Sequence, residues 1–491
     1  MASDETLLDE HSNPNAITSE NTRQQQENSP KMSPDEIPTY DAVIIGGGLS
    51  GLTTAYLLRN KNILLLEKEA RFGGRVKSEQ IDELTNNVGT QFFSDEGGFI
   101  TRLMDELDIE RTRHKPRDVP YAFYVEGEYY PTLKSLMSWR VHVDRLKLIA
   151  RAAPRFLAFL KPESHPKRQK VVAQNIVELY DKLHPLTNAL VTSYMRGACL
   201  AKPERTSAGI GSGLMLGVFF MGEASWITGG FQQVTDRIAA KLGDSARYGV
   251  EVTRVENADG LVRVTYVEDG DELVATARGA AVTTPAMVVP RIVAGLPEER
   301  AKAFEQVKYG PLLMVSLIFD PEVPWDRFFA MGSDDTVFQM VIDQTFGTPA
   351  DDNPDNPVVC NCIIAQYPDE TAEIERLAAT SDDEIIQQAV ADLARVVPGA
   401  EDAAEFLQDA KVTRWPVGEI ELSPEYYTEL LPQIREPLGN IHFAGDYTHP
   451  MSFVDGAVLS AVTTARTLGS DLVTADDDRA FKLSAALLKR R

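Results

Sequence analysis

Three glycines with nucleotide-binding spacing follow directly after the run at residues 41–45. Gly46 would permit a tight turn, Gly48 would let the backbone approach a pyrophosphate, and Gly51 would let a helix pack closely on a strand. A helix that starts near Ser50 would present unpaired N–H groups and its positive dipole end to the phosphates. The chemistry that this spacing indicates is the binding of a dinucleotide.

An acidic residue and a second glycine pair support this interpretation. Glu67 closes a second apolar run, residues 63–66, and an acid at the tip of that strand can accept hydrogen bonds from a ribose hydroxyl. Gly73 and Gly74 follow, and adjacent glycines let a backbone crowd a ligand, while Arg75 can pair with a phosphate. A plain Gly-Gly turn with a solvated arginine is the alternative. Together the residues predict a βαβ nucleotide-binding unit.

Composition bounds the class of protein. The chain has 491 residues, enough for a large core and two domains or more. Its formal net charge of −24 argues against a nucleic-acid partner and against a strongly anionic membrane surface. Three cysteines are too few for a disulfide framework, and no metal-ligand spacing occurs, so we expect a reduced, cytoplasmic setting and no metal site.

Targeting and membrane signals are weak. Residues 1–38 are polar and acidic and are predicted to be a disordered leader. No run approaches the roughly 18 apolar residues that are needed to cross a bilayer. Residues 151–160 and 481–491 are basic and apolar, which allows peripheral membrane contact at most, with packed surface helices as the alternative.

The order of elements predicts an α/β fold with a discontinuous cofactor domain. After the βαβ unit we expect a largely helical stretch over residues 98–188, a strand and hairpin over 250–277, a separate short strand at 280–284, and a final strand and helix over 441–468. The cofactor domain, with a parallel sheet, would comprise residues 39–97, 205–287 and 410–475. Residues 98–204 and 288–409 would form an α+β substrate domain, and residues 476–491 a tail.

These motifs together resemble a known family. Residues 46–51, Glu67 and residues 73–75 resemble the FAD fingerprint of the flavin amine oxidase superfamily, which also includes protoporphyrinogen oxidases and phytoene-type desaturases. Residues 440–446 and 452–457 are similar to its C-terminal flavin segment. The resemblance covers residues 40–470 in three blocks and implies a Rossmann-like FAD-binding domain.

The resemblance implies a set of cofactor contacts. The residues implied to hold FAD are Gly46, Gly48, Ser50, Gly51, Glu67, Gly73, Gly74, Arg75, Gly89, Thr90, Val252, Asp446 and Val454. In the family pattern Glu67 meets the adenosine ribose, Val252 the adenine and Asp446 the ribityl or phosphate groups. Gly89 and Thr90 would border the flavin ring.

One implied contact has an independent physical reason. Val454 enters the final helix and would aim its N–H at the N1/O2 edge of the flavin. Reduced flavin carries negative charge near N1, and a helix N-terminus in a dry site stabilises that charge. Since residues 411–447 contain no cysteine, we expect the FAD to be bound non-covalently.

The reaction is less well defined than the cofactor. Met314 falls where amine-oxidising members carry a lysine, Phe453 matches one of two substrate-flanking aromatic residues, and Trp415 is the nearest candidate for the other. Hydride transfer to flavin needs positioning and a dry pocket above all, so no catalytic acid or base is assigned.

Three functional interpretations follow. The first is an FAD-dependent oxidoreductase that takes hydride from a small hydrophobic substrate, in the manner of a protoporphyrinogen oxidase or phytoene desaturase, with O2 or a quinone as possible electron acceptor. The second is a flavin amine or amino-acid oxidase. The third is a flavin-bearing isomerase or cyclase, or a lipid-binding module of the same fold.

Overall fold

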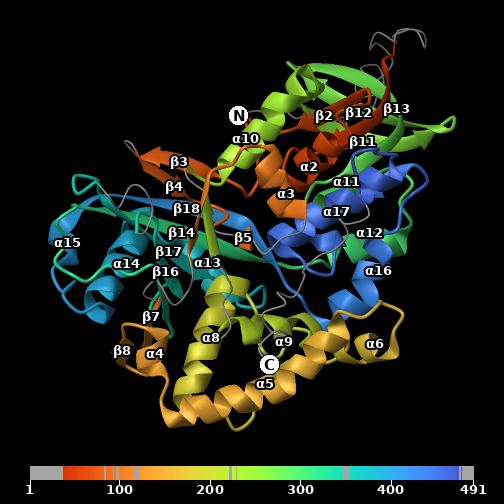
Figure 1. Cartoon of the computed structure of the whole chain (residues 1–491). Helices are drawn as coiled ribbons and strands as arrows, with labels where there is room; N and C mark the ends of the chain where they lie inside the picture. Colours follow the sequence, from red (N-terminus) through yellow and green to blue (C-terminus); the bar gives the residue numbers. More distant parts are fainter. Residues whose placement is uncertain are drawn as a thin grey trace, which may run out of the picture.

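The computed structural model describes residues 37–81, 84–91, 93–94, 99–114, 121–219, 224–227, 229–346, 353–474 and 477. Within these residues the chain builds two large sheets, with a group of helices at the far side of the second (Figure 1). Nearly all of the predicted leader, residues 1–38, and of the predicted tail, residues 476–491, lies outside the described residues. Among the described helices, none combines the length and apolar character that crossing a bilayer requires.

The first sheet is built around the predicted βαβ unit. β1 (Thr39–Ile45) and β2 (Ile63–Glu67) pair in parallel, and α2 (Leu49–Leu57) connects them. Every residue of α2 and β2 is buried, because both faces of this part of the sheet are covered. The order β10-β2-β1-β13-β12-β11, with β19 beside β13, is completed by β10 (Ala246–Tyr248), β11 (Glu251–Ala258), β12 (Leu261–Glu268), β13 (Asp271–Val282) and β19 (Ile441–Phe443).

β13 differs from the prediction of two short strands. It is one strand of 12 residues whose first half pairs antiparallel with β12 and whose second half pairs in parallel with β1 and β19. The predicted strands end at residue 277 and start again at residue 280, yet the pairing with β1 continues through Gly279. The prediction of a separate strand at residues 280–284 is therefore wrong, because sheet pairing on both sides overrides the weak local signal.

The second sheet has the order β18-β14-β17-β16-β15-β7-β8. Its strands are β7 (Tyr121–Val125), β8 (Glu128–Tyr130), β14 (Tyr309–Phe319), β15 (Ala330–Ser333), β16 (Met340–Asp343), β17 (Val358–Ala365) and β18 (Leu407–Ile420). β18 pairs with β14 throughout, so residues 410–420 belong to this sheet and not to the cofactor domain where the sequence placed them. The other predicted domain boundaries stay a prediction.

Helices and short strands surround the sheets. The shorter strands are β3 (Ser78–Ile81), β4 (Leu84–Asn87), β5 (Phe93–Ser94), β6 (Arg111–His114) and β9 (Ala224–Ile227). The helices up to the middle of the chain are α3 (Phe99–Glu106), α4 (Leu133–Leu136), α5 (Trp139–Phe159), α6 (Pro166–Val172), α7 (Val177–Tyr180), α8 (Pro185–Cys199), α9 (Ala208–Gly217) and α10 (Gln232–Leu242). The later ones are α11 (Val289–Ile292), α12 (Glu298–Glu305), α13 (Thr371–Ala379), α14 (Asp382–Val396), α15 (Ala403–Phe406), α16 (Leu431–Ile434) and α17 (Phe453–Thr467).

The stretch predicted to be largely helical, residues 98–188, also contains three strands. β6, β7 and β8 interrupt it, and β7 joins the second sheet by pairing with β15. The prediction is therefore correct only for α3 and for the helices from α4 onward. The strand at residues 121–125 is short and is completed by a partner more than 200 residues later, which a local pattern does not reveal.

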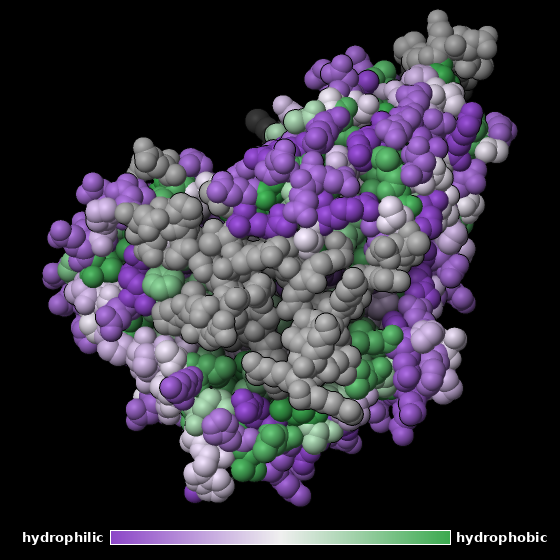
Figure 2. Space-filling view, in the orientation of Figure 1, coloured by the Kyte–Doolittle hydropathy of each residue, from purple (hydrophilic) through white to green (hydrophobic). Residues whose placement is uncertain are grey.

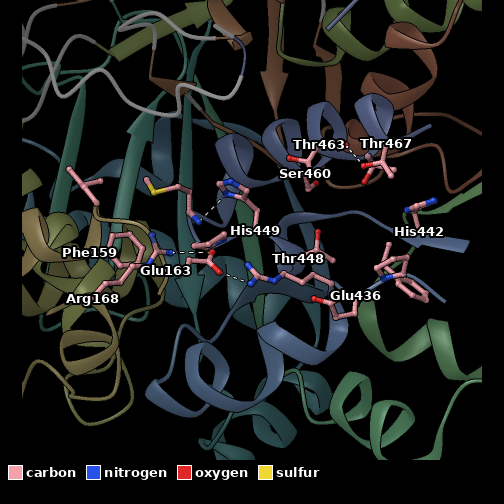
Figure 3. Close-up of a pocket in the computed structure, with 17 residues that line it drawn as sticks. Phe159, Glu163, Arg168, Glu436, His442, Thr448, His449, Ser460, Thr463 and Thr467 are labelled. Atoms are coloured by element: carbon pink, nitrogen blue, oxygen red, sulfur yellow. Dashed lines mark hydrogen bonds and ion pairs between the residues drawn. The ribbon is translucent and has the colours of Figure 1, made fainter. Parts of the chain in front are cut away.

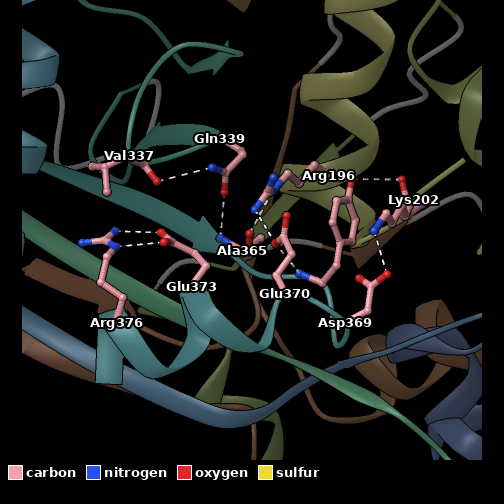
Figure 4. A network of polar contacts seen from close by, with 11 residues as sticks. Arg196, Lys202, Val337, Gln339, Ala365, Asp369, Glu370, Glu373 and Arg376 are labelled. Carbon is pink, nitrogen blue, oxygen red and sulfur yellow. Dashed lines mark hydrogen bonds and ion pairs between the residues drawn. The ribbon is translucent and has the colours of Figure 1, made fainter. Parts of the chain in front are cut away.

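Charged side chains fasten α8 to the end of β17 (Figure 4). Arg196 donates from Nε to the carbonyl oxygen of Ala365 at 3.0 Å, and its Nη2 pairs with Glu370 Oε2 at 2.7 Å. Lys202, just after the helix, pairs with Asp369 at 2.7 Å. The arginine reaches both a backbone carbonyl and a carboxylate, so the end of the helix is fixed in position as well as held by charge.

A buried polar network joins β4 to the second sheet. Asn86 donates to Ser316 Oγ, Ser316 donates to Asn361 Oδ1, and Asn361 donates to Asn86 Oδ1, each at 2.8 Å. Asn361 also donates to the carbonyl oxygen of Asn87 at 2.7 Å. All four side chains are buried, so the bonds form in a low-dielectric setting where an unpaired group is costly.

Replacing Asn361 with alanine should destabilise the fold strongly. The change leaves buried oxygens of Asn86 and Asn87 without their donor, and we expect a loss of about 2–4 kcal/mol in the free energy of unfolding. Urea titration of the purified protein measures this loss. The exposed Asn353→Ala is the matched control and should change stability by less than about 0.5 kcal/mol. Equal effects of the two substitutions would contradict the role given to the network.

Candidate functional site

The glycine loop between β1 and α2 has no room for a side chain at two of the three motif glycines, Gly46 and Gly51. Gly46 has φ +105°, and a Cβ on Gly51 would lie 1.9 Å from the carbonyl oxygen of Gly46. Glycine at these two positions lets α2 start directly against the loop. At Gly48, by contrast, no atom lies within 4 Å of a Cβ position. The loop therefore leaves open space beside the backbone of Gly48.

Glu67 lies at the end of β2, and its carboxylate binds the glycine loop. Oε2 accepts a hydrogen bond from the N–H of Gly47 at 2.5 Å, and Oε1 accepts one from the N–H of Glu69 at 2.8 Å. Each carboxylate oxygen retains capacity for a further donor such as a hydroxyl. Val250 donates to the carbonyl oxygen of Glu67 at 2.8 Å, which brings the start of β11, with Val252, beside this corner.

The second glycine pair lies directly on the first loop. Gly73 donates its N–H to the carbonyl oxygen of Gly47 at 2.8 Å and forms a bridge with Gly48. A Cβ on Gly74, whose φ is +56°, would lie 3.3 Å from Cα of Gly48. The two motifs that are separated in sequence thus form one glycine-lined surface.

Arg75 and Asp446 extend this surface toward the second sheet. Arg75 Nη2 lies 2.8 Å from Asp446 Oδ1, and Nη1 donates to the carbonyl oxygen of Gly418 at 2.6 Å. The Asp446 side chain is 5% exposed, and its Oδ2 has no hydrogen-bond partner. The Arg75 side chain is 38% exposed, so it keeps accessible donors beside a buried acceptor that lacks a donor. Such a pair can bind a ligand that carries both hydroxyl and phosphate groups.

The start of α17 carries unusual backbone geometry. Ser452 and Phe453 have φ of +49° and +55°, values that cost residues other than glycine about 1–3 kcal/mol each. Ser452 Oγ is buried without a partner. Val454 follows in the first turn, and burial raises the pKa of Asp455 to about 6. The helix start is thus held in a strained form next to the Asp446 turn.

A serine contact fastens this helix to the glycine loop. Ser50 Oγ in α2 lies 3.2 Å from Ser460 Oγ in α17, and Ser460 Oγ accepts the N–H of Gly445 at 2.9 Å. Ser50 is 5% exposed. Its side chain therefore connects the two helices, and only its backbone N–H, in the first turn of α2, faces the position expected for a phosphate.

The second sheet forms the wall of the candidate site that lies opposite the glycine loop. Trp415 donates from Nε1 to the carbonyl oxygen of Val88 at 2.7 Å, directly before the predicted flavin-bordering residues. Thr90 donates its N–H to the carbonyl oxygen of Arg75 at 3.2 Å, and a Cβ on Gly89 would lie 2.1 Å from that same oxygen. Trp415, Gly89, Thr90 and Arg75 are thus brought together, although Trp415 is 327 positions from Val88 in sequence.

Met314 shares a face of the second sheet with Trp415. Trp415 is directly opposite Leu312 in the β14–β18 pairing, and Met314 is opposite Thr413, so all four side chains lie on one face. Met314 is 5% exposed and belongs to a small apolar cluster with Phe329, Met340, Ile342 and Ile363. Phe453, at the start of α17, packs instead against the large hydrophobic cluster.

Glu419 is a titratable residue that the sequence prediction missed. It follows Gly418 on β18, and its Oε2 is buried without a hydrogen-bond partner. Burial raises the pKa of its carboxyl group to about 7, while Arg75 lowers that pKa and Asp446 raises it further. The sequence did contain a signal for this residue, since Glu419 is the one acidic residue within the otherwise apolar residues 416–420. Perturbed carboxyl groups of this kind gather at functional sites.

A separate pocket lies away from the glycine loop. It has a volume of about 690 Å³ and is lined by Phe159, Glu163, Arg168, Arg435, His449 and Thr463 among others (Figure 3). Glu163 pairs with Arg435 at 2.5 Å and with Arg168 at 3.5 Å across it. None of the glycine loop, Glu67 or Arg75 lines this pocket. The nucleotide-type residues therefore define a different site.

The arrangement fits a dinucleotide cofactor on three observations. The space beside Gly48 accommodates a pyrophosphate, the unpaired Oδ2 of Asp446 can accept from a hydroxyl, and the accessible guanidinium of Arg75 can donate to a phosphate. For metals the geometry offers no comparable set, since the described residues hold no cluster of three or more His, Cys, Asp or Glu side chains suited to an ion.

Comparisons with known proteins agree with this geometry. The family described as "Flavin containing amine oxidoreductase" matches residues 49–468. The chain is 24% identical over 476 residues to amine oxidase [flavin-containing] A of Canis lupus familiaris, covering 87% of this chain and 84% of that protein. It is 26% identical to amine oxidase [flavin-containing] B of Sus scrofa over 466 residues, covering 87% and 85%.

Solved structures show the same fold. Putrescine oxidase, in a structure of the wild type bound to putrescine, has a TM-score of 0.71 and 21% identity, covering 88% of this chain and 99% of that one. Cyclohexylamine oxidase from Brevibacterium oxydans IH-35A has a TM-score of 0.69 and 20% identity, covering 89% and 100%. The predicted α/β class with a parallel sheet is confirmed, and at these identities the likeness to solved structures concerns the fold alone.

Gly48→Leu should abolish flavin retention without unfolding the protein. Nothing in the fold occupies the position of the new side chain, and the φ of −72° suits any residue, so the leucine would fill only the open space. We expect at least about a hundredfold weaker FAD binding, measured by absorbance after gel filtration, with an unchanged Tm of the flavin-free form. Gly51→Ala is the contrasting control, since its Cβ collides with the loop and should lower that Tm. A yellow Gly48→Leu protein would refute the assignment.

Glu419→Gln should make the fold less sensitive to pH. The pKa of about 7 lies above the ordinary value of 4.5, so the native state holds this proton more tightly than the unfolded state does. The wild type therefore loses stability as the pH rises from about 4.5 to about 7, and the neutral glutamine avoids that loss. The variant should have the higher Tm near pH 8 and the same Tm as the wild type near pH 5. A gap in Tm that is constant with pH would contradict the raised pKa.

Proposed function

Because the chain belongs to the flavin-containing amine oxidoreductase family, we propose that this FAD-dependent oxidoreductase is an oxidase of an amine that carries an apolar group. The observation that carries the proposal is the extent of the family match, residues 49–468, which includes both the glycine loop and the segments that form the wall opposite it. The amine oxidases among its relatives extend over most of the chain and support the choice of substrate class.

We assign cofactor binding to the surface that the two glycine motifs form. The backbone of Gly48 and the start of α2 would receive the pyrophosphate, and Glu67 the adenosine ribose. Arg75 and Asp446 would bind the linker between pyrophosphate and flavin, with the unpaired Oδ2 of Asp446 accepting from a hydroxyl. No cysteine is available in residues 411–447 for attachment, so the FAD would be held non-covalently.

Substrate binding would occur against the apolar face that Trp415 and Met314 share. Bound FAD supplies a two-electron acceptor for this family's reactions. Met314, Phe329 and Ile363 are buried, and such a wall excludes water and favours the neutral form of an amine over its ammonium form. The amine would lose two electrons and two protons to become an imine, which water hydrolyses to a carbonyl compound with release of ammonia or a smaller amine. O2 would then take up the two electrons and two protons and become hydrogen peroxide.

Met314 favours a second candidate. By resemblance this position is a lysine in amine-oxidising members, and a buried thioether has no proton to give or take. The same apolar wall would suit dehydrogenation of a hydrophobic molecule that contains no amine, such as a polyene or a porphyrinogen. The two candidates share the cofactor surface and differ only in the group that is oxidised.

Anaerobic mixing of the yellow holoprotein with possible substrates distinguishes the candidates. We expect an apolar monoamine such as benzylamine to bleach the flavin absorbance at least about tenfold faster than putrescine, whose second ammonium group would have to be desolvated against the apolar wall. Acid precipitation of the same preparation should release free FAD. Bleaching by polyenes or porphyrinogens but by no amine would overturn the amine proposal and favour the second candidate.

A further inference from the structure

The exposed apolar side chains of the described residues are concentrated on one helix. Of seven large hydrophobic side chains that are exposed there, five lie on α5 or directly after it. They are Trp139, Val143, Leu146, Leu157 and Leu160, with Trp139 exposed by 71% and Leu146 by 62%. Clusters of this kind mark surfaces that contact a partner, whereas single exposed hydrophobic residues need no explanation.

Their spacing places them on one face of α5. Trp139, Val143, Leu146, Ala150, Pro154 and Leu157 recur every three or four residues, and all six are exposed. The opposite face contains Val141, Leu148, Ala152 and Phe159, which are buried in the main hydrophobic cluster. The helix therefore has two apolar faces, of which the protein covers only one. We call the other the outer face of α5.

The charge of this region is opposite to that of the rest of the chain. Residues 134–170 contain ten Lys and Arg against two acidic residues, a net charge of +8, although the whole chain carries −24. Arg140, Lys147 and Arg151 lie beside the outer face, one position after Trp139, Leu146 and Ala150. An apolar stripe with basic flanks is the pattern of helices that lie in the interface of an anionic membrane.

The position of α5 suits contact with a flat surface. The helix has 21 residues, about 32 Å in length, and lies along the edge of the molecule farthest from the first sheet (Figure 1). Hydrophobic residues are visible on this edge in the space-filling view (Figure 2). A second copy of the chain is the less favourable partner for a symmetric contact, since it would bring two segments of charge +8 together.

We propose that the outer face of α5 docks on a lipid bilayer that contains anionic lipids. Trp139, Leu146 and Leu157 insert at the boundary between headgroups and acyl chains, and the neighbouring basic side chains lie over the lipid phosphates. The net charge of the chain, which argues against an anionic membrane, hides a local surface of the opposite sign. This inference does not depend on the substrate of the enzyme.

Sedimentation of the full-length holoprotein with vesicles tests the proposal. We expect binding to vesicles of phosphatidylcholine and phosphatidylglycerol, weaker binding to phosphatidylcholine alone, and release at high salt. The triple variant Trp139→Gln, Leu146→Gln, Leu157→Gln should bind anionic vesicles at least about tenfold more weakly, because glutamine preserves helix formation but removes the apolar face. Unchanged flavin content and Tm would show that the variant is folded.

A charge variant with a matched control separates a specific face from general attraction. Arg140→Glu with Arg151→Glu should weaken binding to anionic vesicles at least about tenfold. Arg278→Glu with Lys302→Glu makes the same change in net charge at exposed positions away from α5 and should leave binding within about twofold. Equal effects of the two pairs would overturn the proposal.

Two further results would overturn it. One is a wild type that binds neither kind of vesicle. The other is a triple variant that binds anionic vesicles as tightly as the wild type. If the wild type is instead a dimer that the triple variant dissolves, and neither binds vesicles, the outer face is a contact between copies. Quenching of Trp139 fluorescence by brominated lipids, absent in Trp139→Phe, would support insertion directly.

Discussion

The buried ring of hydrogen bonds among Asn86, Ser316 and Asn361 fixes the position of β4 against the second sheet. Both sheets contribute to the candidate site, since Arg75 follows β2 of the first sheet and Trp415 lies on β18 of the second. Each polar group of the ring satisfies another, so moving β4 away from the second sheet would leave several of them unpaired. Asn86 of this ring lies just before Val88, Gly89 and Thr90 in sequence, so these three residues lie where β4 meets the second sheet. The proposed binding of cofactor and substrate would thus depend on one set of contacts that touches neither ligand.

The sequence correctly predicted those elements whose stabilising contacts are close in sequence. The βαβ unit follows from periodicity and glycine spacing, because β1, α2 and β2 are adjacent in sequence and mostly apolar where they pack. β13 was predicted as two strands, and only its pairing with β1 shows that it is continuous. Residues 410–420 of β18 were placed in the cofactor domain for the same reason, because their pairing with β14 is not visible in the local pattern. A strand of alternating polarity does not reveal which sheet it joins.

The residues of the candidate site also differ in whether their surroundings are local in sequence. Gly46, Gly51 and Glu67 have the structural surroundings expected from their motif, because each is constrained by backbone atoms within the same unit. Glu419 was missed because its chemistry arises from burial beside Arg75 and Asp446, which are far away in sequence. The outer face of α5 was indicated only in part: residues 151–160 allowed peripheral membrane contact, but the sequence does not show which of two apolar faces is covered. Net charge averages over segments of opposite sign, so it does not show the charge of +8 on residues 134–170.

The shared position of β13 has a consequence for how the protein is made. β1 and β2 leave the ribosome early, but β13, their neighbour in the sheet, follows only after residue 271, and β19 after residue 441. During synthesis the glycine loop therefore exists beside an open, apolar sheet edge, which is prone to wrong pairing. Of the candidate cofactor residues, Asp446 and Val454 are made last. The candidate cofactor surface is therefore complete only when nearly the whole chain has emerged, so its full set of contacts is available to flavin only late in synthesis.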